Sequence, residues 1–193
     1  MKHNTEKLTA LLIFVSLWML PFAGCATLDD QMREYSIGQT GPAGGIIFYD
    51  RGPQEGRWRY LEVAPVEYEQ SLLWGPSDIE LETSLALGAG PGNTQAIAEA
   101  FDAAGKFDTA AQYSSSLVIN SYDDWFLPSR DELNLMYHIL GVRNPEKFRG
   151  VGNAYWSSSQ YSKTLAWAKG FASGVQGRIE KFDRLIVRPI RAF

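Results

Sequence analysis

Residues 120–137 read NSYDDWFLPSRDELNLMY, and this stretch contains the clearest local structural signal in the chain. Ser129 is followed three residues later by Glu132, which is the spacing of a capping box, in which each side chain bonds the backbone N–H of the other residue. A helix is therefore predicted to begin at Ser129, and Gly141 is predicted to end it. The apolar run 125–127 directly before the cap predicts a short buried strand that leads into the helix.

The rest of the chain predicts one further helix and a set of short strands. Asn93 or Thr94 can cap a helix whose apolar residues share one face and which ends near Gly105. Residues 65–92 have no clean period and predict a long loop. Alternating or short apolar runs predict strands at 46–49, 58–63, 117–119, 154–157, 165–171, 178–182 and 185–190. Two helices among antiparallel strands indicate an α+β domain.

The N-terminus has the features of a secretory signal peptide. Lys2 and Lys7 precede a run, residues 8–22, that is almost entirely apolar, and small residues follow it. Residues 1–24 are therefore predicted to be removed on export. The alternative is an uncleaved membrane anchor, but the run is shorter than the roughly 20 residues that span a bilayer.

The residues after the apolar run resemble a bacterial lipobox. Residues 22–25 read FAGC, and in a lipobox the cysteine is diacylated and becomes the new N-terminus. Cys25 is the only cysteine in the chain, which excludes an internal disulfide framework in an exported protein. Residues 25–44 are then expected to form a lipid anchor and tether, with the acyl chains binding the membrane as partner. Ala26, and not an aspartate, stands immediately after Cys25, so we expect an outer-membrane or cell-surface location.

Four short runs carry a resemblance to a known family. They are GGIIF at 44–48, DDWFLPS at 123–129, YWSSS at 155–159 and VRPIR at 187–191. Their order and content resemble the DUF1566 domain, which also occurs at the C-terminal end of a Legionella collagen-like adhesin. The resemblance covers residues 45–193.

The resemblance also implies a fold. Residues 127–132, LPSRDE, are similar to a segment of formylglycine-generating enzymes, and both relations imply a C-type-lectin-like α+β domain. In that fold two helices pack on short antiparallel strands, and the first and last strands are adjacent. Fold alone does not assign an activity, because function resides in a site.

The composition and the scarcity of reactive side chains exclude several functions. The formal net charge of the chain is −4, whereas nucleic-acid binding needs a basic surface, so no nucleic-acid partner is expected. His138 is the only histidine after the predicted signal peptide and lies on the polar side of the predicted helix. With one histidine and one cysteine, a zinc site of the usual ligand type cannot be assembled, and the cysteine chemistry of the formylglycine-generating enzymes is absent.

An acidic turn precedes the capped helix. Asn120, Asp123 and Asp124 carry oxygen ligands of the kind that calcium prefers, which makes calcium the one candidate cofactor. The alternative is an Asx-type turn that positions the strand and the helix. The Glu-Pro-Asn and Trp-Asn-Asp signatures of calcium-dependent lectins are absent from the chain.

Aromatic residues beside hydroxyls mark the candidate binding face. Tyrosine and tryptophan combine an apolar body with a polar edge, which suits a glycan or protein interface. Trp125 lies inside an apolar run and is expected to be buried. The candidate ligand-binding residues are Trp74, Tyr155, Trp156, Ser157, Ser158 and Tyr161.

These features lead to one functional hypothesis and two alternatives. The hypothesis is a non-enzymatic, lipid-anchored envelope or surface protein, an adhesin-type module that binds a glycan or a host or envelope protein. One alternative is an enzyme acting on cell-wall or surface polysaccharide through Asp123, Asp124 or Glu132, which requires two carboxyl groups facing one cleft at roughly 5–10 Å. The other is a structural envelope lipoprotein.

Overall fold

The computed structural model describes residues 33–53, 56–144, 147–148 and 154–193. They form two sheets and three α-helices, so the α+β prediction is confirmed. The strands are β1 (Ile46–Asp50), β2 (Tyr60–Val63), β3 (Gln70–Leu73), β4 (Ala154–Gln160), β5 (Leu165–Gly170), β6 (Gln176–Glu180), β7 (Arg184–Val187) and β8 (Ile190–Ala192). The helices are α2 (Gly90–Ala103), α3 (Ala110–Ser116) and α4 (Arg130–Met136), with a 3₁₀ turn η1 (Val66–Tyr68) and a π-helical turn η2 (Tyr137–Gly141).

The strands divide into a three-stranded sheet A and a five-stranded sheet B. Sheet A has the order β1-β2-β8 and sheet B the order β3-β7-β4-β5-β6. The predicted adjacency of the first and last strands is therefore wrong in detail, because β2 lies between β1 and β8. The reason is local: β1 and β2 form an antiparallel hairpin, and the outer edge of β2 then pairs with β8. Within sheet B, β4 and β7 run parallel, whereas the other neighbours are antiparallel.

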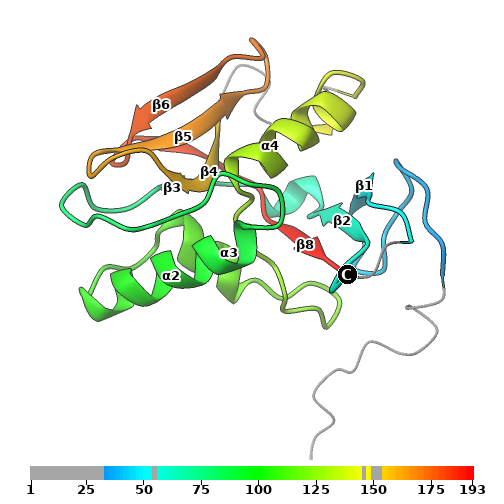
Figure 1. Cartoon of the computed structure of the whole chain (residues 1–193), viewed down its shortest axis with the longest axis horizontal. Coiled ribbons are helices and arrows are strands. Elements are labelled where there is room, and N and C mark those ends of the chain that lie inside the picture. The colour runs from blue at the N-terminus through cyan, green and yellow to red at the C-terminus, as the bar shows by residue number, and fades with distance from the viewer. Residues whose placement is uncertain (1–32, 54–55, 145–146, 149–153) are drawn as a thin grey trace, which may run out of the picture.

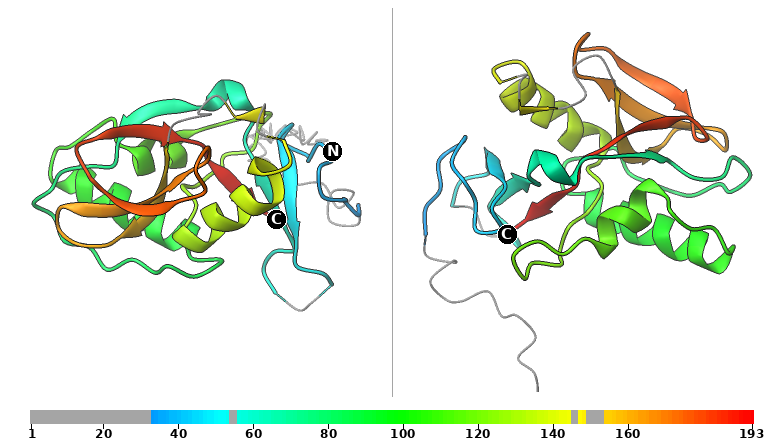
Figure 2. Two further views of the ribbon diagram at one scale, coloured as in Figure 1. Left: turned by 90° about the horizontal axis from the view of Figure 1, so that it is seen from above. Right: turned by 180° about the vertical axis from the view of Figure 1, so that it is seen from behind.

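The helices and sheets enclose two main groups of buried side chains. In Figure 1, α2 and α3 lie below β4 to β6, whereas β1, β2 and β8 lie on the right. One apolar core joins sheet A to α4 and η2, and the other joins sheet B to α2 and α3. Figure 2 shows that the last strand, β8, runs from the sheet B side of the molecule into sheet A. The C-terminal strands thus connect the two cores.

The helix predicted at Ser129 is confirmed together with its cap. The Ser129 backbone N–H donates to Glu132 Oε2 at 2.7 Å, and the Glu132 N–H donates to Ser129 Oγ at 3.3 Å. The helix continues from α4 into η2 and ends at Gly141, as predicted. Trp125 is buried, as expected, and Phe126 bridges to Ile190 of β8.

The first predicted helix begins earlier than expected, at Gly90. Asn93 and Thr94 do not cap it, because both side chains are buried inside its first turns. Asn93 exchanges hydrogen bonds with the backbone of Ser84 at 2.7 and 2.8 Å, and Thr94 Oγ1 accepts from Leu127 N at 3.0 Å. These polar residues therefore fix the neighbouring segments instead of starting the helix.

Three further predictions of local structure are wrong. Helix α3 was not predicted, although Thr109 and Gln112 form a capping box at its start. The predicted loop 65–92 contains η1 and β3, because β7 supplies a pairing partner for β3 that is distant in the sequence. The predicted strand 117–119 reduces to one bridge between Ile119 and Tyr122 around a tight turn with positive φ at its two central residues.

The predicted tether is partly folded onto the domain. Tyr35 is buried and packs edge-on against Tyr60, and Ala43 is fully buried. Residues 33–44 thus belong to the domain. Residues 25–32, including Cys25, lie outside the described residues. No helix in the described part of the chain is long and apolar enough to cross a membrane.

Candidate functional site

Most of the predicted aromatic and serine binding face lies in the core. Five of its six side chains are at most 1% exposed: Trp74, Tyr155, Trp156, Ser157 and Ser158. They cannot form a binding surface in this structure, so that prediction is wrong for them. The cause is topological for the four residues on β4, because β4 lies between β7 and β5 in the middle of sheet B and α2 contacts it. Trp74 directly follows β3 and is covered by Phe101 of α2, which meets its ring edge-on. The sequence pattern could not show that β4 is a central strand.

The polar atoms of these buried residues are hydrogen-bonded inside the core. Trp74 Nε1 donates to the Ser157 carbonyl oxygen at 2.7 Å, and Trp156 Nε1 donates to the Leu72 carbonyl oxygen at 3.0 Å. The hydroxyl of Ser159 donates to the Ser84 carbonyl oxygen at 2.9 Å and so holds the loop before α2. These groups stabilise the fold and are not available to a ligand, because breaking their hydrogen bonds would leave buried polar atoms unpaired.

The acidic turn is held by hydrogen bonds within the chain. Asp124 accepts two hydrogen bonds from the Arg191 guanidinium, at 2.7 and 2.9 Å, and Asn120 Nδ2 donates to the Ala43 carbonyl oxygen at 3.1 Å. Within the described residues no group of three or more histidine, cysteine, aspartate or glutamate side chains has the arrangement of a metal site. The geometry of Asn120, Asp123 and Asp124 favours the structural-turn interpretation over calcium binding.

Two buried arginines of the VRPIR run connect the sheets. Arg188 lies 3.1 Å from Glu69 Oε1 and also donates to the carbonyl oxygens of Ala64 and Lys147. The Tyr155 hydroxyl donates to the same Glu69 oxygen at 2.9 Å. Burial lowers the pKa of Arg188, and the Glu69 carboxylate opposes that shift.

The second arginine, Arg191, bridges Asp124 and Glu62. Arg191 lies 3.2 Å from Glu62 Oε2, and Gly45 N–H donates to Glu62 Oε1 at 2.7 Å. Burial raises the pKa of Glu62, whereas the Gly45 and Arg191 contacts lower it. A Cβ atom on Gly45 would lie 2.1 Å from the Val63 carbonyl oxygen, so only glycine fits there. All four runs that resemble DUF1566 thus contribute buried structural contacts.

Glu132 is likewise a structural carboxylate. It is fully buried, and besides its cap it accepts from Gly88 N–H at 2.8 Å. Burial raises its pKa, and the hydrogen bonds from Ser129 and Gly88 oppose the rise. Because it is enclosed by its own cap, Glu132 faces no cleft and is not available as a catalytic acid or base.

A buried lysine gives a testable pH dependence. Lys181 is fully buried, donates to Gln160 Oε1 at 2.7 Å and to the Ile79 carbonyl oxygen at 3.0 Å, and lies 4.6 Å from the Trp74 ring centroid. Burial lowers its pKa from 10.5 to about 8. Below that pH both the folded and the unfolded chain carry the proton. Between pH values of about 8 and 10.5 the unfolded chain binds more protons at Lys181 than the folded chain does. The free energy of unfolding therefore increases as the pH rises through this range.

We therefore expect the stability of the wild-type chain relative to a Lys181→Met variant to increase from pH 7 to pH 10. Urea unfolding of both proteins at matched pH values measures this difference, and the comparison cancels all other titrating groups. A difference that stays constant or falls over this range would contradict the burial of a charged Lys181.

An acidic groove lies between α2 and the turn before α4. It has a volume of about 400 Å³, and Glu99, Asp102, Asp123 and Asp124 are among its lining residues. Three of these carboxylates have partners: Glu99 accepts from Gln95, Asp102 accepts from Gln112, and Asp124 pairs with Arg191. The groove brings together two residues of the carboxylate hypothesis, Asp123 and Asp124, but not Glu132.

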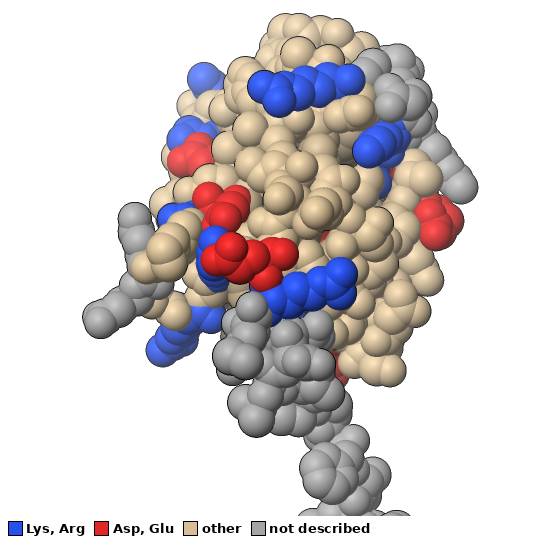
Figure 3. Space-filling view, turned by 90° about the vertical axis from the view of Figure 1, so that its right-hand side faces the viewer, with Lys and Arg blue, Asp and Glu red and all other residues tan. Residues whose placement is uncertain are grey.

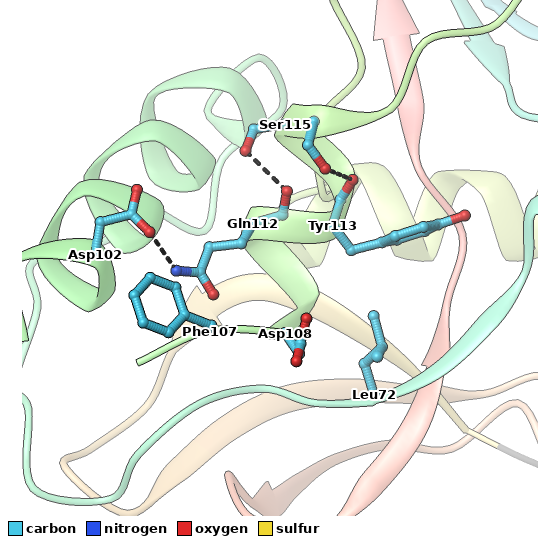
Figure 4. Close-up of a pocket in the computed structure, with 8 residues that line it drawn as sticks. Leu72, Asp102, Phe107, Asp108, Gln112, Tyr113 and Ser115 are labelled. Atoms are coloured by element: carbon cyan, nitrogen blue, oxygen red, sulfur yellow. Dashed lines mark hydrogen bonds between the residues drawn. The ribbon is translucent and has the colours of Figure 1, made fainter. Parts of the chain in front are cut away.

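A second groove of about 400 Å³ lies beside the edge strand β3, as Figure 4 shows. Leu72 and Tyr113 line it, and Phe107 at its margin is 70% exposed. Its polar groups bond one another, with Gln112 Nε2 donating to Asp102 Oδ1 at 2.5 Å. The groove presents apolar surface and few unoccupied hydrogen-bonding groups.

Tyr161 is the one predicted ligand-binding residue that is exposed, with 48% of its surface accessible. It belongs to a cluster that we call the ladder, formed by Arg130, Tyr161, Trp167 and Arg178. The Arg178 guanidinium lies 4.2 Å from the Tyr161 ring centroid and 5.1 Å from that of Trp167. Arg130 lies 5.4 Å from the Trp167 ring, and the two rings meet edge-on at 5.6 Å.

Sequence reasoning missed three members of the ladder. The sequence predicted a strand at 165–171, but it gave no register for the neighbouring strand. In the structure Trp167 pairs with Arg178 across β5 and β6, so their side chains share a face. Arg130 arrives from α4, which packs beside β4 and β5.

Charges elsewhere on the surface are mixed. On the face shown in Figure 3, acidic and basic side chains are interspersed and separated by uncharged surface. Some of the surface charges are paired within the described structure: Arg59 bonds both Asp50 and Glu34. This face has no broad patch of one sign among its described residues.

Comparison with known proteins gives a relation in fold. No family model matches the chain, and no curated protein matches its sequence. The structure is similar to a fimbrial protein from Bacteroides ovatus, with a TM-score of 0.51 and 13% sequence identity. The similarity covers 77% of this chain and 44% of that protein, so this chain spans less than half of its neighbour. At this identity the likeness concerns the fold alone.

Proposed function

We propose that the protein is an exported, lipid-anchored surface module that binds a glycan or protein ligand and catalyses no reaction. This proposal rests on the contrast between the candidate catalytic groups, which are mostly bonded within the fold, and the ladder, which is partly exposed. Of the candidate catalytic carboxylates, Glu132 is buried and bonded within its own cap, and Asp124 is paired with Arg191. The ladder, in contrast, exposes aromatic and guanidinium groups, which are the types enriched at binding interfaces.

The structural comparison supports the proposed surface display. A fimbrial protein is a surface structure, and a similar fold in this chain is consistent with display outside the cell. We also propose membership of the DUF1566 family and a C-type-lectin-like architecture, on the strength of the four sequence runs. The two sheets and the capped helix that those runs build support this assignment.

The binding proposal is tested with glycan and extracellular-matrix arrays. The full chain, purified in detergent and shown to be folded by circular dichroism, is expected to bind at least one immobilised glycan or protein. A folded protein that binds nothing on either array would contradict the proposal and favour the structural-lipoprotein alternative. Protease treatment of intact cells distinguishes surface display from a periplasmic position.

Lipid anchoring is tested at Cys25. We expect a Cys25→Ser variant to lose essentially all incorporation of labelled palmitate and to leave the membrane fraction, since the acyl chains supply the membrane affinity. Metabolic labelling and cell fractionation measure both effects, with the wild-type chain as control. Undiminished labelling of the variant would refute acylation at this position.

A polysaccharide-active enzyme is the second candidate, and the acidic groove is the observation that favours it. Asp123 is the lining carboxylate without an amide or guanidinium partner in the described structure. Release of new reducing ends from cell-wall polysaccharide by the wild-type chain, and its loss in Asp123→Asn, would establish this alternative over the binding module.

A further inference from the structure

The ladder is built on the face of sheet B that is opposite α2 and α3, beside the start of α4. Trp167 and Arg178 are cross-strand partners on β5 and β6, and Tyr161 begins the connection between β4 and β5. The neighbouring residues Ala166 and Ala168 are buried in the core on the opposite side of β5. The alternation of the strand therefore points Trp167 away from α2 and α3. The ladder thus rests on regular strands, which hold its groups in fixed positions.

Arg178 is the member of the ladder whose donors are unused. Its guanidinium contacts two aromatic rings, but in the part of the chain that the structure describes it has no hydrogen-bond acceptor and no carboxylate at ion-pair distance. Arg130, in contrast, pairs with Asp131 at 2.8 Å. A guanidinium has five N–H donors arranged as a fork that matches a carboxylate. Stacking on the rings orients this fork before a ligand arrives.

We propose that the ladder binds an acidic polysaccharide by pairing Arg178 with the carboxylate of a uronic acid. This inference rests on the proposed binding function and names its ligand class and site. The carboxylate matches the planar fork of Arg178, and the half-exposed ring of Tyr161 offers apolar surface to the adjacent sugar ring. The chain as a whole has a net charge of −4, so attraction of an anionic polymer depends on this local group.

The position of the ladder fits recognition at a distance from the membrane. In Figure 1 β6 lies at the upper left, whereas the first described residues, from 33 onward, lie at the right. The views in Figure 2 agree that these regions are at opposite sides of the molecule. A chain anchored through Cys25 would therefore present the ladder away from its anchored end.

The test measures binding of polygalacturonate oligosaccharides to the full chain in detergent. Arg178→Met keeps the apolar stem of the side chain and removes its charge, and we expect it to weaken binding about tenfold or more. Tyr161→Ala is expected to weaken binding as well. Arg57→Met is the matched control, since Arg57 is also exposed and the substitution changes the net charge equally. This control is expected to bind like the wild type.

The outcomes separate the ligand class, the site and the underlying function. Loss of binding in Arg178→Met with an unchanged unfolding midpoint supports the inference. Equal binding by Arg178→Met and the wild type overturns the site but not the binding function. Tighter binding of polyglutamate than of polygalacturonate overturns the ligand class in favour of an acidic protein segment. Binding of neutral ligands alone on the arrays overturns this inference and leaves the proposed function intact, whereas no binding at all overturns both.

Discussion

Replacement of Arg188 by methionine is expected to destabilise the fold by about 3–5 kcal/mol, because it removes the counter-charge that Arg188 provides to the buried Glu69 carboxylate. Both side chains of the Arg188–Glu69 pair are only 1% exposed. The substitution also removes the donors to the carbonyl oxygens of Ala64 and Lys147. Urea unfolding followed by tryptophan fluorescence measures the change in the free energy of unfolding.

Two controls identify the cause of this loss. The double variant Arg188→Met with Glu69→Leu removes both charges, and it should recover much of the stability that the single variant loses. Arg59→Met breaks a partly exposed ion pair with Asp50 and should cost no more than about 1 kcal/mol. A loss below about 1 kcal/mol in Arg188→Met, or a double variant less stable than the single one, would contradict the structural role of the pair.

Truncation of Trp156 to alanine is expected to cost about 3–5 kcal/mol as well. The side chain is fully buried in the core between sheet B and α2 and α3, and its indole N–H bonds the Leu72 carbonyl oxygen on β3. The variant therefore creates a cavity and removes a hydrogen-bond donor from the part-buried Leu72 carbonyl oxygen. Far-UV circular dichroism during urea unfolding measures the loss without depending on the tryptophan that is removed.

Trp58 provides the comparison for this prediction. It is half-buried at the margin of the other core, and Arg51 covers its ring at 5.1 Å. Trp58→Ala should cost clearly less than Trp156→Ala, since it removes less buried surface. Similar losses in the two variants would show that Trp156 is not the buried residue that this structure describes.

The fold was predictable where local chemistry decides structure. The Ser129 and Glu132 capping box gave the start of α4, and Gly141 gave the end of the helix. The alternation of residues in the C-terminal half gave most strands of sheet B. The capping box at Thr109 and Gln112 was equally visible in the sequence, and it would have predicted α3.

The remaining features depend on contacts between distant residues. Strand β3 exists because β7 pairs with it, and β1 is separated from β8 because the hairpin partner β2 takes the place between them. The same cause explains the wrong prediction for Trp74 and Trp156. Aromatic residues serve both cores and interfaces. Only the central position of β4 shows that Trp156 belongs to the core, and only the packing of α2 shows it for Trp74, which follows β3 and meets Phe101 edge-on.

The candidate site was also predictable only in part from the sequence. Tyr161 was found because an aromatic residue stood beside hydroxyls in a loop-like stretch. Arg178 and Arg130 were missed because the register of β5 with β6 and the packing of α4 bring them to Trp167. Arg188 and Arg191 belong to the VRPIR run, one of the four runs that resemble DUF1566. Both side chains are buried, so this run stabilises the fold and does not form a binding site.

The most direct measurement is a side-by-side comparison of the wild-type chain and Arg178→Met on the same glycan and matrix arrays, with the stability of each protein measured in parallel. The account predicts that the wild type binds at least one ligand and that the variant, although equally stable, loses that signal. A folded wild-type chain that binds nothing, or a variant that keeps the full signal, would contradict it.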